Sequence, residues 1–224
     1  MQRTDRTKRI GFLLPLAIVL IFSGSGKADT VFRPPSDLLP ADQYRVVFAS
    51  STRHEVNFRD LTIYDQILDS LGDTIIESDW QVLGTSTLSP NARIRTQTDT
   101  SEEIPIYRFD GLRVADGYDD FWDGTLDRPV QFDENGMDLG RDFVWTGMSE
   151  FGTYIGDGMG DGFVRSGLTN RTDRRWARDG FDLNGSRNRL YGMSGVLTVT
   201  AVPEPSSAVV VGVFVACFLT QRRT

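Results

Sequence analysis

The stretch Tyr44-Arg-Val-Val-Phe-Ala49 combines β-branched and aromatic residues, so it predicts a β-strand. A helix is predicted after it: Asp60 precedes apolar residues that recur every three or four positions from Leu61 to Leu71, and Gly72 ends the pattern. This spacing places the apolar side chains on one face of the helix, and that face requires a surface to cover it. We therefore expect the helix at residues 60–71 to lie on a sheet that contains residues 44–49.

Shorter apolar runs indicate further strands at residues 80–83, 104–109 and 143–145, separated by stretches rich in Gly, Asp and Asn. Residues 190–199 predict a last long strand, in which Gly192 and Gly195 are candidate bulges. Because β-rich runs stand at both ends of this region, we expect residues 44–49 to pair with residues 190–199 in one sheet. A strand, one main helix, short strands in long loops and a final strand together indicate an α+β domain.

The composition excludes several functional classes. The 224 residues are 39% hydrophobic and 11% aromatic, which is enough to build a globular core. A single histidine, His54, and a single cysteine, Cys217, exclude Cys/His zinc sites, Ser-His-Asp and Cys-His nucleophile systems and an internal disulfide. The net charge is −7, and residues 29–202 alone carry −12. We therefore expect no nucleic-acid partner, since such a partner requires a basic surface.

The N-terminus has the order of a secretory signal peptide. Four basic residues between Arg3 and Arg9 precede the apolar run 10–22, and small residues including Gly26 and Ala28 follow. This run of 13 residues is short for a transmembrane span and typical of a signal peptide. We expect signal peptidase to remove residues 1–28, and residues 29–43, which contain three prolines, to form an extended linker. A membrane anchor that is kept at the N-terminus is the alternative.

The C-terminus carries a second membrane signal. Pro203-Glu204-Pro205 precedes an uncharged apolar run, which predicts a short transmembrane helix at residues 206–220, and Arg222 and Arg223 follow it. Such a helix is about 22 Å long, against a hydrocarbon core of about 30 Å. The arginines should stay in the cytoplasm, which leaves residues 29–205 outside.

The tripeptide, the apolar helix and the basic end, all within residues 202–224, resemble the PEP-CTERM sorting signal of exported bacterial proteins. This resemblance implies transient anchoring in the inner membrane of a Gram-negative organism and recognition by an exosortase. It further implies cleavage near the tripeptide and delivery to the cell surface or extracellular matrix. A plain C-terminal anchor is the alternative.

Motifs rich in Trp and Gly follow one another through residues 44–201. They include Trp80-Gln-Val-Leu-Gly84, Phe121-Trp-Asp-Gly124, Val144-Trp-Thr-Gly147 and Leu190-Tyr-Gly-Met-Ser-Gly195. Their order resembles the C-type-lectin-like, endostatin-related domains of bacterial surface proteins. The resemblance implies paired terminal strands, one helix against that sheet and a long loop region. It does not extend to the calcium-dependent sugar site, because the triplets Glu-Pro-Asn, Gln-Pro-Asp and Trp-Asn-Asp are absent.

A calcium site is one candidate for the chemistry of the loops. Asp157 and Asp161 lie in a Gly-rich stretch, and calcium takes oxygen ligands from such turns. No stretch fits an EF-hand loop, and Asp, Asn and Gly also favour ordinary turns, so both interpretations stay open. No other cofactor is expected.

Ligand-binding candidates also lie in the loops between residues 110 and 182. Trp122 and Trp145 could stack on sugar faces, and Arg175 belongs to a late arginine cluster that could hold an anionic polysaccharide. The alternative for Trp122 is a short helical turn at residues 119–123 whose aromatic rings enter the core. For the arginines it is pairing with nearby aspartates.

We expect an exported, non-enzymatic surface or matrix protein that interacts with exopolysaccharide or another surface component. A carboxylate-based polysaccharide hydrolase and a purely structural matrix protein are the alternatives. The hydrolase would require two carboxylates in an open cleft lined by Trp.

Overall fold

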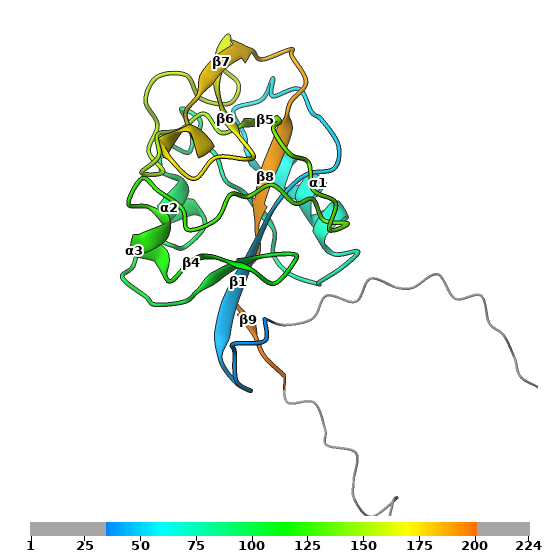
Figure 1. The fold of residues 1–224 in the computed structure, drawn as a ribbon. Helices are drawn as coiled ribbons and strands as arrows, with labels where there is room; N and C mark the ends of the chain where they lie inside the picture. Colours follow the sequence, from blue (N-terminus) through cyan, green and yellow to red (C-terminus); the bar gives the residue numbers. More distant parts are fainter. Residues whose placement is uncertain (1–34, 201–224) are drawn as a thin grey trace, which may run out of the picture.

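Strand β1 (Gln43–Ala49) occupies the middle of the sheet in the computed structural model, which describes residues 35–200 (Figure 1). It pairs in antiparallel with β8 (Arg189–Met193) and with β9 (Leu197–Thr198). The expected pairing of residues 44–49 with residues 190–199 is therefore confirmed. The prediction of a single final strand over residues 190–199 is wrong in one respect, because residues 194–196 separate β8 from β9. There Ser194 Oγ accepts the backbone N–H of Val46 (2.9 Å) and takes the place of a regular ladder contact.

The other strands extend this centre on both sides. They are β2 (Gln81–Val82), β3 (Ile106–Arg108), β4 (Arg113–Ala115), β5 (Phe143–Trp145), β6 (Phe163–Leu168) and β7 (Gly180–Leu183). Along the sheet the order is β4-β3-β1-β8-β5-β6-β7, and β2 also pairs with β8. The pairs β1–β3 and β5–β8 are parallel, and the other pairs are antiparallel. The predicted strands contain β2, β3 and β5, whereas β4, β6 and β7 were not predicted.

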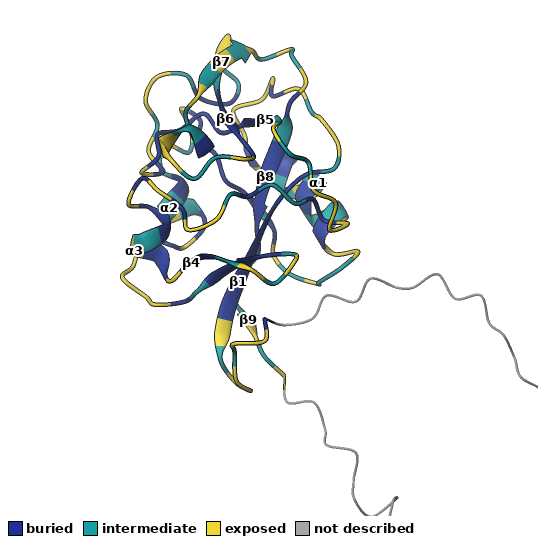
Figure 2. Cartoon of the chain, viewed as in Figure 1, coloured by how far each residue is buried: buried dark blue, intermediate teal, exposed yellow. Residues whose placement is uncertain are grey.

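Side chains alternate between the two faces of the sheet, and both faces are covered at its central strands (Figure 2). In β1, Val46 and Phe48 belong to one buried cluster, and Val47 and Ala49 belong to the other. All four side chains are fully buried. The central strand therefore reads as a continuous apolar run rather than as an alternation of apolar and polar residues.

Helix α1 (Thr62–Gly72) covers the first face through its buried residues Tyr64 and Leu68, so the predicted helix over the sheet is confirmed. It ends where it meets Trp80. A Cβ atom at Gly72 would lie 2.3 Å from the Trp80 ring, so only glycine fits at this contact.

The second face is covered by the loop region and its short helices. These are α2 (Ala92–Arg95), α3 (Tyr118–Phe121) and the 3₁₀ helix η1 (Arg174–Trp176). The predicted turn at residues 119–123 corresponds to α3, and the rings of Phe121 and Trp122 enter the core as expected. The chain is thus a mixed α+β protein in which sheet predominates.

Both ends of the described chain lie at the same end of the molecule, beside β9 (Figure 1). Ala41 N–H donates to the carbonyl of Val199 (2.9 Å), and Val199 N–H donates to the carbonyl of Asp42 (2.9 Å). Residues 35–43 of the expected linker therefore pack on the domain. The expected signal peptide and transmembrane helix 206–220 lie outside the described residues. Within residues 35–200, no helix is long and apolar enough to cross a membrane.

Candidate functional site

The two tryptophans proposed to bind sugar are buried. Trp122 is 2% exposed, and its indole N–H donates to Thr98 Oγ1 (2.8 Å). Trp145 is fully buried in β5 and donates to the carbonyl of His54 (2.8 Å). Neither ring has a face open to solvent, which corrects the expectation that they stack on sugars. Trp80 and Trp176 are buried as well. Trp80 does line a hollow of about 390 Å³, together with Asp65, Asp69 and Asp79, but only 1% of this tryptophan is exposed.

Asp157 and Asp161, the candidate calcium ligands, are each engaged by other side chains. Asp157 Oδ2 accepts from Arg165 (2.6 Å), while Asp161 accepts from the Tyr154 hydroxyl (2.9 Å) and pairs with Arg59 (3.1 Å). Within residues 35–200, no group of three or more His, Cys, Asp and Glu side chains is placed to hold a metal ion.

The late arginine cluster divides into paired and unpaired members. Arg175 donates to Asp173 (2.7 Å) and keeps 41% of its side chain exposed, so it stays only a predicted ligand contact. Arg178 and Arg189 also pair with acids. Arg174 and Arg187 are exposed and make no ion pair with any described residue.

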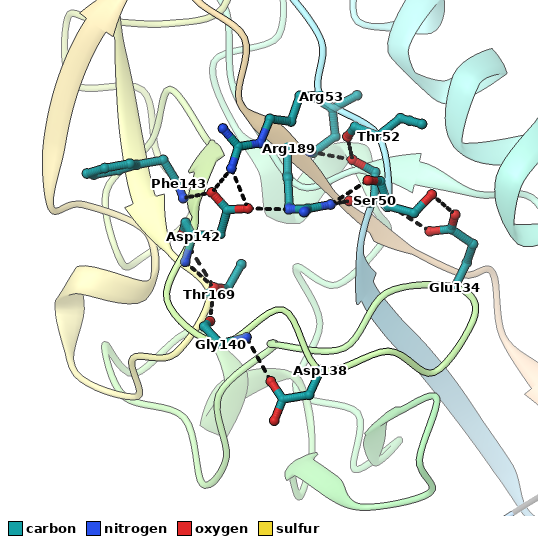
Figure 3. A network of polar contacts seen from close by, with 12 residues as sticks. Ser50, Thr52, Arg53, Glu134, Asp138, Gly140, Asp142, Phe143, Thr169 and Arg189 are labelled. Atoms are coloured by element: carbon teal, nitrogen blue, oxygen red, sulfur yellow. Dashed lines mark hydrogen bonds and ion pairs between the residues drawn. The ribbon is translucent and has the colours of Figure 1, made fainter.

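A polar network surrounds Asp142, immediately before β5 (Figure 3). Arg189 Nε donates to Asp142 Oδ2 (2.6 Å), and Arg53 donates to both oxygens of the same carboxylate (2.8 and 2.9 Å). Arg189 Nη1 also donates to the carbonyls of Ser50 and Ser51, each at 2.6 Å. Asp142 thus joins the start of β8 to the segment that follows β1.

The network continues on both sides of these arginines. Glu134 accepts the backbone N–H of Ser51 (2.8 Å) and a hydrogen bond from the Ser51 hydroxyl. Thr169 Oγ1 accepts from the backbone N–H of Asp142 (2.9 Å) and donates to the carbonyl of Gly140 (2.5 Å). The network therefore holds the loops that carry Ser51, Glu134 and Asp142 close together, although they are far apart in the sequence.

The electrostatics of Asp142 follow from these contacts. Burial alone would raise the pKa of the Asp142 carboxyl. Hydrogen bonds from Arg189 and from the Phe143 N–H, together with the charges of Arg189 and Arg53, outweigh burial and hold that pKa below its ordinary value. Asp142 is consequently a carboxylate near neutral pH, and the two arginines keep their counterion.

A hollow of about 370 Å³ lies beside this network and is lined by Thr52, Arg53 and Arg187. We call it the arginine hollow. Thr52, which lines the hollow, also contacts the histidine: its Oγ1 atom lies 2.7 Å from His54 Nε2. Burial first, and then the positive charge of Arg187, lower the pKa of His54. The sequence did not single out Arg53, because nothing in its local pattern distinguishes it from an ordinary surface arginine.

A larger hollow in the described part of the chain has the opposite character. It has a volume of about 640 Å³ and is lined by Glu102, Glu103, Asp116, Asp119 and Asp120, with Arg113 as its basic residue. Arg113 is already held by Asp116 and Asp37. The carboxylates of this hollow can accept hydrogen bonds, but nothing in its lining identifies a particular ligand.

An exposed apolar face lies on the β6–β7 hairpin. Phe163 is opposite Leu183 in the ladder, and the Phe163 and Phe181 rings meet edge to face with centroids 5.9 Å apart. All three side chains are more than half exposed. β7 lies at the end of the molecule away from β9 (Figure 1), and the turn that leaves it carries Arg187.

The candidate site is therefore the arginine hollow with its supporting network. Its residues come from the segments after β1 and before β8, and neither segment carries a recognisable motif. The sorting residues Pro203, Glu204, Pro205, Arg222 and Arg223 lie outside the described residues. No protein-family model matches this sequence, and no curated protein is similar enough to count as a relative.

Proposed function

We propose that this chain is an exported, non-enzymatic protein of the cell surface or extracellular matrix that interacts with exopolysaccharide. In this proposal, signal peptidase removes residues 1–28, and the PEP-CTERM segment at residues 202–224 anchors the chain in the inner membrane until an exosortase cleaves it. Residues 44–201 form a C-type-lectin-like domain. The order of basic, apolar and small residues at the N-terminus and the three-part C-terminal signal support the export route.

The observation that carries the proposal is the position of the chain ends. β1 and β9 pair, and Ala41 and Val199 are hydrogen-bonded, so the described chain begins and ends at one end of the domain. A tail attached there would leave the opposite end, with β7 and its loops, facing outward (Figure 1). Binding groups concentrate on surface loops that a rigid scaffold holds in place.

The paired terminal strands, the single main helix and the long loop region support the C-type-lectin-like assignment. Burial of the tryptophans leaves charged loop residues, rather than stacking aromatics, as the contacts for a polysaccharide. The same burial leaves little tryptophan surface against which a sugar could stack, which disfavours the hydrolase alternative.

A glycan array tests this proposal with the exported form of the protein isolated from the cell surface. We expect binding to exopolysaccharide fragments that is unchanged when calcium is added or chelated, since Asp157 and Asp161 are engaged by arginines and a tyrosine. Shortening of the bound polysaccharide would favour the hydrolase instead. Failure to bind any glycan would favour a purely structural matrix protein.

A further inference from the structure

We propose that Arg53 and Arg187 form an anion-binding subsite in the arginine hollow, which takes the carboxylate or sulfate groups of an acidic polysaccharide. The assignment rests on the proposed interaction with exopolysaccharide and narrows it to an anionic class. The hollow is lined by the side chains of Arg53 and Arg187 and by Thr52, whose hydroxyl can also donate a hydrogen bond. Arginine suits this task because its planar fork of donors matches a carboxylate or sulfate.

Arg53 is held in place while most of its donors remain available. Only its Nη2 atom donates to Asp142, so Nε and Nη1 make no hydrogen bond within residues 35–200. Its side chain is 52% exposed. Asp142 therefore orients the guanidinium without saturating it, which reduces the entropy lost when a ligand binds.

Arg187 supplies a cation that has no counterion among the described residues. It precedes Asn188, whose backbone exchanges hydrogen bonds with His54 (2.7 and 3.3 Å). This bridge holds the segment of Arg187 beside the segment of Arg53. Glu55 lies on the same segment but does not line the hollow, and its carboxylate accepts from Asn57.

The charges around the hollow favour an anion. Arg53 and Arg187 line the hollow and no acidic side chain among the described residues does, while Asp142 pairs with Arg53 and Arg189 beside it, so positive charge is in excess at the lining. The rest of the domain is acidic, but salt screens exposed charges beyond about 8 Å under physiological conditions. A ligand group inside the hollow therefore interacts mainly with the arginines.

His54 offers a direct measurement because it is the only histidine in the chain. Arg187 lowers the pKa of His54 through its charge, and Thr52 links the hollow to the imidazole. An anion bound at Arg187 neutralises that charge, so it should raise the pKa of His54. Loss of the guanidinium should raise it as well, without any ligand.

The experiment uses the untagged full chain in neutral detergent, labelled with ¹³C at the histidine ring, and follows the His54 resonance through a pH titration. Oligogalacturonate should raise the His54 pKa saturably, and a neutral galactose oligomer of equal length should not. In Arg187→Gln the pKa without ligand should already be higher, oligogalacturonate should bind about tenfold more weakly, and the pKa response should disappear. Arg174→Gln removes another exposed, unpaired arginine outside the hollow and should behave as the wild type.

The outcomes separate this subsite from the wider proposal. An unchanged His54 pKa in saturating oligogalacturonate overturns the subsite, and glycan binding that persists in such a protein leaves the surface interaction intact at another place. A full response in Arg187→Gln also overturns the subsite. If inorganic sulfate shifts the pKa but the oligosaccharide does not, the hollow takes a small free anion, and the polysaccharide assignment is wrong.

Discussion

Asp142 connects segments that are distant in the sequence, because its carboxylate is the shared partner of Arg53 and Arg189. The side chains of Asp142 and Arg189 are 11% and 13% exposed, so little water is present to replace either partner. Removing one member of such a pair costs more than the pair contributes, since the other charge is left without compensation.

Replacing Asp142 by asparagine should therefore destabilise the fold by about 2–3 kcal/mol at neutral pH. The pKa of Asp142 lies below its ordinary value of 3.8, so the stabilisation by the carboxylate is present above that value and is lost as the pH falls through the lowered pKa. The difference in unfolding free energy between the wild type and Asp142→Asn should thus become smaller in strong acid. Urea unfolding at neutral pH and in strong acid measures both effects.

The control for this prediction is Asp119→Asn. Asp119 pairs with Arg93 at 3.5 Å, but its side chain is 67% exposed, so its replacement should change stability by less than about 0.5 kcal/mol. If Asp119→Asn lost as much stability as Asp142→Asn, burial of the ion pair would not be what determines the loss of stability. A difference that stays constant from neutral to acid pH would contradict the role given to the carboxylate.

At the scale of elements, helix α1 fixes the segment that returns to the sheet. Asp65, Asp69 and Asp73 stand four residues apart, so they form one stripe along the helix and just past its end. Each accepts a backbone N–H of the returning segment, from Val82 (2.8 Å), Trp80 (2.8 Å) and Ser78 (3.1 Å) respectively. The helix thus substitutes for a neighbouring strand over residues 78–82.

Two substitutions at Asp69 separate its hydrogen bond from its charge. Burial, and then the negative charges of Asp73, Asp65 and Asp79, raise the pKa of Asp69 against the hydrogen bond from Trp80. A raised pKa means that the ionised form costs stability, and that this cost appears as the pH rises through the pKa. Asp69→Asn keeps an acceptor and removes the repulsion, so it should gain about 0.5 kcal/mol at neutral pH and nothing in acid.

Asp69→Ala should instead lose about 1–3 kcal/mol at neutral pH, because the N–H of Trp80 is left without an acceptor. Thermal unfolding of the two variants beside the wild type measures the contrast. Equal losses in both variants would contradict the separation of charge from hydrogen bonding.

Periodicity predicts α1 because its apolar side chains follow the helix repeat, and the β-branched and aromatic composition of residues 44–49 predicts β1. Periodicity does not predict β6, since Gly167 and two polar residues interrupt the apolar run. Glycine is required at position 167 because a Cβ atom there would lie 1.9 Å from the carbonyl oxygen of Trp176, and the local sequence does not reveal this contact. The role of the aspartate stripe on α1 also escapes prediction, because acids on the polar face of a helix usually face solvent.

At the scale of the whole molecule, the candidate site depends on contacts between segments that sequence patterns do not connect. Arg53 and Arg187 approach through the bridge between His54 and Asn188, which are 134 residues apart in the chain. The sequence indicates that arginines gather late in the chain, but only the fold brings one of them beside Arg53. The same topology places both ends of the described chain, at Ala41 and Val199, at one end of the domain.

That position leads to a prediction about processing. The segment at residues 206–220 is several residues shorter than the roughly 20 that a comfortable span needs, and by the positive-inside rule we expect Arg222 and Arg223 to keep its end in the cytoplasm. We then expect Pro203-Glu204-Pro205 at the outer interface, where its prolines, which disfavour helix formation, should leave it accessible to a membrane protease. We expect the surface form to lack residues 208–224, and replacement of the tripeptide by alanines to leave the protein in the membrane. Mass spectrometry of the surface form decides between the two processing routes, because a C-terminus that still ends at Thr224 would identify an ordinary anchor.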